Sequence, residues 1–344
     1  MAFAAPAAGQ HCGGPCEVPR GADPISVNPR FRLVMGEEKE NWRYLFNWVW
    51  TQDGTPTHRL EGVLNKPPFL GFGYRRMFVS PAGNGFLVTG NPYAMRYVAH
   101  EPGGFEPMLF IFCDPKGQRL VELPLERMLT EQERQTRPCL NCDCCKDVLY
   151  AFAEDPALSQ NGCFVELSAW STQRPIAFFL PLGLPILDRG AFEKVLAASA
   201  WARVPESKRK AEQAAIATAI VGLCSDEPDV RGRAKQALSA KGFLALSALQ
   251  QAMSATAGGR EHLDEVLEGL RPYGQDGWEA LTTDLGLLSS LLSYSDQDVV
   301  RIVHQRLARI VPNVSKLAPL ATITWLEEHR SGLGWNAEQG RYEL

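Results

Sequence analysis

Four cysteines within seven residues form the chemically most distinctive stretch of this 344-residue chain: Cys139, Cys142, Cys144 and Cys145. Thiolates are soft ligands that suit Zn²⁺ or Cu(I), and a Cys-x-x-Cys turn can bring two sulfurs onto one ion. A closed tetrahedral site, however, normally joins two separated cysteine pairs, and here all four sulfurs share one short loop. Adjacent Cys144 and Cys145 would have difficulty reaching the same ion, which counts against a Zn or Cu site.

Disulfide bonds are the favoured interpretation of this cluster, some formed within the loop and others joining it to Cys113 or Cys163. A redox-active Cys-x-x-Cys is a third alternative. No His follows the motif, so covalent haem attachment is not supported. Near the start of the chain, His11 with Cys12 and Cys16 could be half of a metal site, but we expect a flexible leader over residues 1–24 that holds a disulfide.

Cysteine usage indicates an exported protein. Nine cysteines are more than a cytosolic protein of this size usually carries without a metal or a redox role. The opening MAFAAPAAGQHCGGPC has an Ala-x-Ala pattern but no basic or long apolar region, as in the tail of a signal peptide or a disordered leader. We therefore expect a periplasmic or extracellular location, with a cytoplasmic one as the alternative. Because the count is odd, one thiol is left over, and Cys224 is expected to be that thiol, buried in the core.

Charge and hydropathy count against nucleic-acid binding and against a transmembrane segment. The chain has a formal net charge of −4, so it lacks the broad basic field that collects phosphates, and we expect no nucleic-acid partner. The longest apolar run, Ile176–Leu187, is interrupted by prolines and is shorter than the roughly 20 residues that a membrane span needs. We therefore expect no transmembrane segment.

The common catalytic motifs are missing. Gly71-Phe72-Gly73 lacks the third glycine of a nucleotide-binding loop and leads into a predicted strand. There is no Gly-x-Ser-x-Gly elbow and no Walker A lysine, and the histidines are scattered. We expect a protein that is not an enzyme, with no catalytic residue and no cofactor.

Short β-type runs separated by turn residues dominate the first half of the chain and predict an antiparallel β domain over residues 25–185. The predicted strands are Phe31–Met35, Tyr44–Trp50, Leu60–Leu64, Met77–Val79, Phe86–Thr89, Met108–Cys113, Leu120–Leu123, Cys163–Trp170 and Pro175–Leu180, with one helix at Leu125–Arg134. Turns are expected where glycine can adopt positive φ, at residues 52–54, 81–85 and 114–117. FVSPAGNGFLVTG followed by FIFCDPKGQRLVEL resembles blades of propeller-type repeat proteins, which implies a sandwich or a partial, propeller-like sheet.

An aromatic row occupies one predicted strand at every second position: Trp42, Tyr44, Phe46, Trp48 and Trp50. All five share one face of that strand. Core packing is the favoured interpretation, and a platform for a carbohydrate or a partner is the alternative.

Helical periodicity takes over after the Pro/Gly-rich boundary at Pro181–Gly190. The predicted helices are Ala191–Trp201, Ser207–Leu223, two within Ser225–Met253, Glu261–Leu270, Gly277–Leu292, Ser295–Ile310 and Val314–His329. Within Ser225–Met253, Asp226 is the expected N-cap and Gly242 the expected C-cap.

One helix pair occurs in related form twice. Asp226 with Val230-Arg231 returns 70 residues later as Asp296 with Val300-Arg301. The pattern resembles HEAT or armadillo-type helical repeats, which implies a HEAT-like α-solenoid over residues 190–330, with 331–344 as a tail.

The fold class expected is therefore α+β in two domains, an antiparallel β domain carrying the cysteine-rich loop at 139–145 and a C-terminal HEAT-like α-solenoid. The solenoid resemblance implies a non-enzymatic scaffold or accessory subunit that binds another protein. The competing hypothesis is a metal-binding or thiol-redox protein that acts through the cluster at 139–145.

Overall fold

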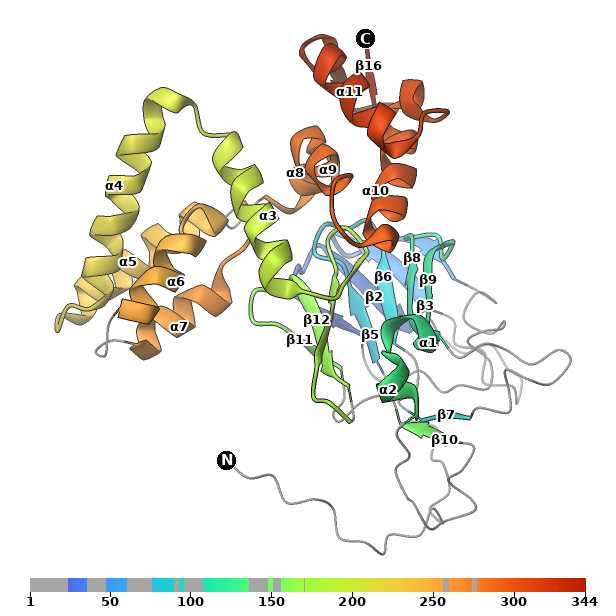
Figure 1. The fold of residues 1–344 in the computed structure, drawn as a ribbon, viewed down its shortest axis with the longest axis horizontal. Helices are drawn as coiled ribbons and strands as arrows, with labels where there is room; N and C mark the ends of the chain where they lie inside the picture. The colour runs from blue at the N-terminus through green and yellow to red at the C-terminus, as the bar shows by residue number, and fades with distance from the viewer. Residues whose placement is uncertain are drawn as a thin grey trace, which may run out of the picture.

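The computed structural model describes residues 24–35, 48–60, 76–89, 93–95, 108–135, 148–150, 156–169, 171–255, 260–273 and 277–344. Antiparallel and mixed sheets come first and helices follow, so the fold is of the mixed α+β class (Figure 1). Within these ranges, no helix combines the length and the apolar character needed to cross a membrane.

A five-stranded sheet is the centre of the β region. Its order is β1 (Ile25–Ser26), β5 (Arg76–Val79), β6 (Phe86–Thr89), β8 (Met108–Cys113) and β9 (Arg119–Pro124). β1 pairs with β5 in parallel and the other neighbours are antiparallel. The predicted strands at 77–79, 86–89, 108–113 and 120–123 are confirmed, and so are the turns between them, because Gly83, Gly85 and Gly117 have positive φ.

Both faces of this sheet are buried, and the alternation of side chains along each strand divides them between two cores. On β6, Phe86 and Val88 face one core whereas Leu87 faces the other. On β8, Ile111 and Phe112 divide in the same way. A sheet covered on both faces carries continuous apolar runs, which is why β8 reads MLFIFC.

A three-stranded sheet covers the first face. It consists of β2 (Phe31–Met35), β3 (Trp48–Gln52) and β4 (Thr55–Arg59). Trp48 and Trp50 are 1% and 2% exposed and lie in the core shared with β5, β6 and β8, which confirms the core interpretation for these two members of the aromatic row. Trp42, Tyr44 and Phe46 lie outside the described residues. The strand predicted over Leu60–Leu64 lies, from residue 61 on, outside the described residues. The structure has a strand that was not predicted, β4, which follows a tight turn where Asp53 and Gly54 have positive φ.

A four-stranded sheet covers the other face. Its order is β11 (Ala157–Leu158), β12 (Phe164–Ser168), β13 (Pro175–Phe179) and β14 (Leu184–Ile186). The ring of Phe178 lies 5.2 Å from that of Phe110 and 5.9 Å from that of Phe112, centroid to centroid, so the two sheets are in direct contact. The predicted strands at 163–170 and 175–180 are confirmed. A separate pair joins β7 (Tyr93–Met95) to β10 (Val148–Tyr150).

The single helix predicted over Leu125–Arg134 is two helices, α1 (Leu125–Met128) and α2 (Glu131–Gln135). A reciprocal capping box restarts the helix: the Thr130 amide donates to the Glu133 carboxylate, and the Glu133 amide donates to the Thr130 hydroxyl. Glu133 was expected on the polar side, but it is buried at 3% exposure and pairs with Arg174 at 2.8 Å.

The predicted boundary at Pro181–Gly190 contains β14 and the start of α3 (Arg189–Ala202), whose N-cap is Asp188. Phe192 of α3 packs its ring 4.9 Å from Phe179 of β13 and 5.9 Å from Tyr294. One cluster of buried residues consequently runs from the sheets into the helices. The β region and the helical region share a core at this point.

The remaining helices form two groups, with α3 between them (Figure 1). The first group contains α4 (Glu206–Leu223), α5 (Pro228–Lys241), the 3₁₀ turn η3 (Gly242–Leu244), α6 (Leu246–Ala255) and α7 (Arg260–Gly269). The second contains α8 (Trp278–Thr283), α9 (Leu285–Leu291), α10 (Gln297–Ile310), η4 (Pro312–Val314), α11 (Pro319–His329) and η5 (Arg330–Gly332). α4 packs against α5 and α6 against α7, while α4 also contacts α6 and α5 contacts α7.

Two helix predictions need correction, one because the helix is interrupted and one because its N-cap is a different residue. The helix predicted over Gly277–Leu292 breaks at Asp284, whose side chain accepts from the amides of Gly286 and Leu287 and starts α9. Asp226 was the expected N-cap of α5, but Glu227 holds that position and its side chain makes no capping bond. In the related stretch, by contrast, Asp296 is the N-cap of α10 and accepts from the Asp298 amide.

The two related stretches also differ in their surroundings. Arg231 donates to the backbone oxygens of Ser225 and Asp226, whereas Arg301 pairs with Asp298. α5 packs among helices, and α10 packs against β14 as well as α9 and α11. Cys224, expected in the core, is exposed, because it ends α4.

The tail at 331–344 forms a hairpin of β15 (Gly334–Asn336) and β16 (Arg341–Glu343). The Tyr342 hydroxyl donates to the carbonyl of Thr283 at the end of α8. The tail therefore packs against the second helix group as a cap.

Candidate functional site

The cysteines predicted to bind metal as the alternative to disulfides, Cys139, Cys142, Cys144 and Cys145, lie outside the described residues, as do His11, Cys12 and Cys16. Cys113 and Cys163, the expected partners on the sheets, carry free thiols and are buried. Burial raises the pKa of Cys113 to about 12 and also raises that of Cys163. The expected staple from the loop to either residue is thus not formed, because both thiols are packed inside the sheets.

The cysteine count can now be divided. Three of the nine cysteines are free, Cys113, Cys163 and Cys224, and the other six lie at 12, 16, 139, 142, 144 and 145. In the part of the chain that the structure describes, no three His, Cys, Asp or Glu side chains are grouped as metal ligands would be. The six cysteines on which the metal and disulfide interpretations depend lie outside the described residues.

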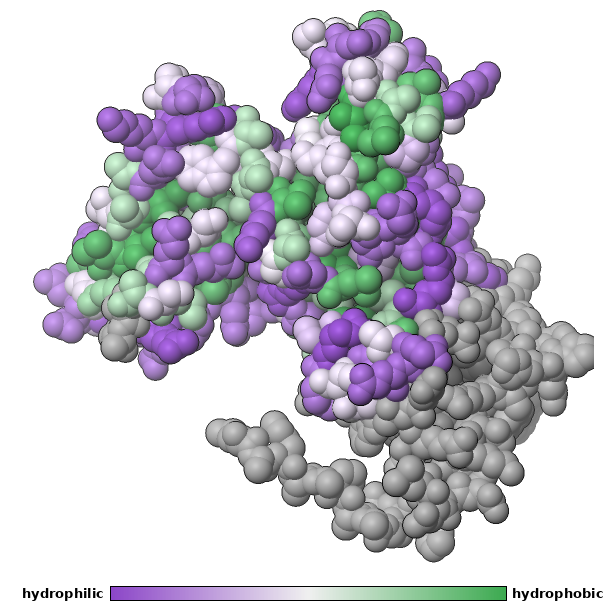
Figure 2. Space-filling model, viewed as in Figure 1, coloured by the Kyte–Doolittle hydropathy of each residue, from purple (hydrophilic) through white to green (hydrophobic). Residues whose placement is uncertain are grey.

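An apolar groove opens between α4 and α6, and we name it the α4–α6 groove. Its volume is about 540 Å³. It is lined by Trp201, Gln213, Ile216, Ala217, Ile220, Leu244, Ser247, Ala248, Gln251, Ala252 and Ala255. None of these described residues is charged, although 22% of the chain is. Figure 2 shows hydrophobic surface on this group of helices.

Small side chains make the groove. Ala248, Ala252 and Ala255 recur at steps of four and three along α6, so they form one narrow stripe. Across from them, α4 offers Ile216, which is buried, and Ile220, which is half-buried. An alanine stripe beside two isoleucines leaves space that no side chain of the described residues fills, with glutamines at the rim.

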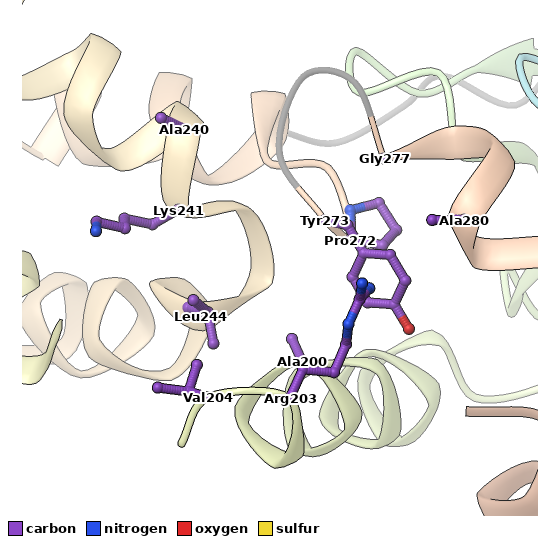
Figure 3. A pocket seen from close by; sticks show the side chains of 10 residues that line it. All are labelled: Ala200, Arg203, Val204, Ala240, Lys241, Leu244, Pro272, Tyr273, Gly277 and Ala280. Carbon is purple, nitrogen blue, oxygen red and sulfur yellow. The ribbon is translucent and has the colours of Figure 1, made fainter. Parts of the chain in front are cut away.

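A second cleft lies between the two helix groups, and we name it the Arg203 cleft. Its volume is about 520 Å³, and it is lined by Ala200, Arg203, Val204, Ala240, Lys241, Leu244, Pro272, Tyr273, Gly277 and Ala280. Figure 3 shows the Arg203 side chain rising from α3 along the ring of Tyr273, with Lys241 pointing away from both. The Arg203 guanidinium carbon lies 4.3 Å from the centre of that ring.

Asp284 fixes Tyr273 and Arg203 in this arrangement. The Tyr273 hydroxyl donates to Asp284 Oδ2 at 2.5 Å, and Arg203 Nη1 lies 3.7 Å from the same oxygen. Burial, together with the neighbouring Asp284 carboxylate, raises the pKa of Tyr273, so it remains a neutral donor. Lys241 is bound elsewhere, to Glu212 at 2.5 Å.

No protein-family model, curated protein or solved structure matches this chain. The sequence predicted the helix Ser207–Leu223 that contains Ile216 and Ile220, but it gave these residues no role in binding. It missed Arg203, Tyr273 and Asp284, because they come from three elements and no spacing within the sequence connects them.

Proposed function

We propose that this protein is a non-enzymatic interaction scaffold that binds a helical segment of another protein in the α4–α6 groove. The observation that carries the proposal is the groove itself, an open apolar channel whose lining contains no charged side chain among the described residues. Contiguous exposed apolar surface of this kind marks interaction sites. An amphipathic helix fits because it presents apolar residues at steps of three and four, matching the alanine stripe of α6.

The helix packing supports a HEAT-like interpretation of the first helix group. α4–α5 and α6–α7 are successive helical hairpins, with α4 beside α6 and α5 beside α7. That is the relation between neighbouring units of an α-solenoid, where each unit contacts the next and leaves a surface free for a partner. For the β region, we propose that the three face-to-face sheets form a partial, propeller-like stack that supports this surface. The cysteine content supports an exported location, periplasmic or extracellular.

The test is binding of the partner by variants that change only the groove. The partner is first captured from the native source through a photo-crosslinking residue at position 252 and then purified for titration. Ala252→Glu places a charge in an apolar channel, so the affinity for the isolated partner should fall at least about tenfold, since an unpaired charge in an apolar contact is costly. Ala237→Glu on the exposed face of α5 is the matched control and should bind as the unmodified protein does.

Equal affinity of the two variants would overturn the proposal, as would a captured partner that crosslinks equally well from position 237. Circular dichroism of both variants checks that the helices are intact. A partner segment that binds but contains no helix when bound would also contradict the proposed mode of binding.

A further inference from the structure

A smaller hollow continues the Arg203 cleft toward the C-terminal hairpin. Its volume is about 380 Å³, and it is lined by Arg203, Ala280, Thr283, Asp284, Leu285, Arg330, Leu333 and Tyr342. Arg203 and Ala280 line both hollows, so the two are continuous. Two guanidinium groups, from α3 and from η5, therefore face one cavity.

The only carboxylate among these lining residues of the described chain is already occupied. Asp284 Oδ1 accepts from the amides of Gly286 and Leu287, at 2.8 and 3.1 Å. Asp284 Oδ2 accepts from Tyr273 and lies 3.7 Å from Arg203 Nη1. With Arg203 about half exposed, this long contact leaves most of its N–H donors available to a ligand.

Arg330 reaches the same point from the other side. A methyl group placed on Gly286 would stand 2.9 Å from Arg330 Nη2 and 3.2 Å from Asp284 Oδ1, so the guanidinium and the carboxylate approach the same backbone position. Yet Arg330 has no ion-pair partner among the described residues. Two positive groups and one negative group give the hollow a surplus positive charge.

The walls next to these arginines are apolar. Ala200, Val204, Leu244 and Pro272 line the larger hollow together with the ring of Tyr273 (Figure 3). A cavity with a charged end and an apolar wall favours a ligand that has one charged group and an apolar body. A planar guanidinium binds a planar carboxylate through paired hydrogen bonds.

We propose that the Arg203 cleft binds an organic carboxylate with an apolar body. Its carboxylate lies between Arg203 and Arg330, and its apolar body lies against Tyr273 and the wall formed by α3 and η3. The carboxylate can come from a small aliphatic acid or from the C-terminus of an apolar peptide. The cleft shares one lining residue, Leu244, with the α4–α6 groove, but neither arginine lines that groove, so the proposal does not depend on the partner helix.

The experiment is isothermal titration of the full chain with two acids and their neutral counterparts. Octanoate and octanamide test a small aliphatic acid, and N-acetyl-leucyl-leucine with its amide tests a peptide end. Each acid is titrated into the unmodified protein, Arg203→Gln, Arg330→Gln and the control Arg233→Gln, an exposed arginine of α5 that lines neither hollow.

At least one acid should bind with a Kd below about 1 mM, and its amide should bind at least about tenfold more weakly. Arg203→Gln and Arg330→Gln should each weaken the acid about tenfold, while Arg233→Gln leaves it unchanged. Which acid binds identifies the source of the carboxylate.

Failure of both acids to bind, or equal binding of acid and amide, overturns the proposal. Because Arg330 is exposed and has no described partner to lose, Arg330→Gln is the deciding variant if Arg203→Gln reduces stability, and unchanged affinity in it also overturns the proposal.

Discussion

Arg306 of α10 donates from Nη1 to the carbonyl oxygen of Leu182 across 3.0 Å, and thereby joins the second helix group to the segment before β14. Desolvation lowers the pKa of Arg306 to about 10, with nearby Arg309 contributing, but the group stays charged at neutral pH. If this hydrogen bond were broken, the partly buried guanidinium and the carbonyl would both lack a partner, which is costly. The bond therefore fixes the position of α10 relative to the segment before β14.

We predict that Arg306→Ala lowers the free energy of unfolding by about 1–3 kcal/mol, because the variant loses a charge-assisted bond and leaves the Leu182 carbonyl without its donor. Urea unfolding followed by circular dichroism measures the change. Arg309→Ala is the control on the same helix, since its side chain is exposed. A loss of equal size in the control would contradict the assignment, because alanine favours the helix at least as well as arginine does and Arg309 does not bond to Leu182.

Phe192→Ala tests the core shared by the sheets and α3. Phe192 is fully buried and its ring contacts those of Phe164, Phe179 and Tyr294. The cavity left by the ring should cost about 3–5 kcal/mol, and the β and helical signals should shift together in thermal unfolding because both sides lose contacts. Val221→Ala, at a side chain that is 74% exposed, should change stability by less than about 0.5 kcal/mol. Two separated transitions that shift independently would contradict a shared core.

The pH dependence of the free energy of unfolding should show the stabilising contribution of ionised Glu133. Burial alone would raise the pKa of this carboxyl, but hydrogen bonds from Arg174, from the Thr172 hydroxyl and from the Thr130 amide outweigh it and lower the pKa from 4.5 to about 2. Since the folded-state pKa is lowered, the stabilisation is complete above pH 4.5 and is lost as the pH falls toward 2. The shift corresponds to a contribution on the order of 3 kcal/mol.

Glu133→Gln should therefore remove part of the fall in stability between pH 4.5 and 2, as measured by urea midpoints across that range. Glu338→Gln is the control, because Glu338 is exposed in the C-terminal hairpin. The same pH profile in the Glu133 variant and in the unmodified protein would refute the assignment.

Local chemistry made the central sheet predictable from the sequence. β6 and β8 were placed at Phe86–Thr89 and Met108–Cys113 because turns containing Gly83, Gly85 and Gly117 bound continuous apolar runs. Helices such as α4 and α7 were predictable because their apolar residues recur at three- and four-residue steps. In these elements, the residues of a short stretch of sequence are sufficient to determine the secondary structure.

The buried Glu133 and the site were missed because they depend on partners distant in the sequence, whereas the break at Asp284 has a local cause. Glu133 looks like a surface residue of a short helix until Arg174, on another part of the chain, neutralises it. Apolar residues continue through Asp284, so periodicity alone predicts one helix where the Asp284 cap begins another. Distance in the sequence hid the site: Arg203, Tyr273 and Arg330 come together only when α3, the segment after α7 and η5 pack around one cleft.

Counting thiols decides between the two interpretations of the cysteines that lie outside the described residues. We propose that those six form disulfides with one another, which leaves Cys113, Cys163 and Cys224 as thiols. In the folded protein only Cys224 should react quickly with an alkylating reagent, because burial shields the other two and raises their pKa values. After denaturation without a reductant, three thiols should be alkylated, and after reduction, all nine. Mass spectrometry counts them, and metal analysis of the same sample completes the test.

Stoichiometric Zn or Cu, together with nine alkylated thiols before any reductant is added, would instead establish Cys139, Cys142, Cys144 and Cys145 as candidate ligands, because thiolates bound to a metal become free when the fold is lost.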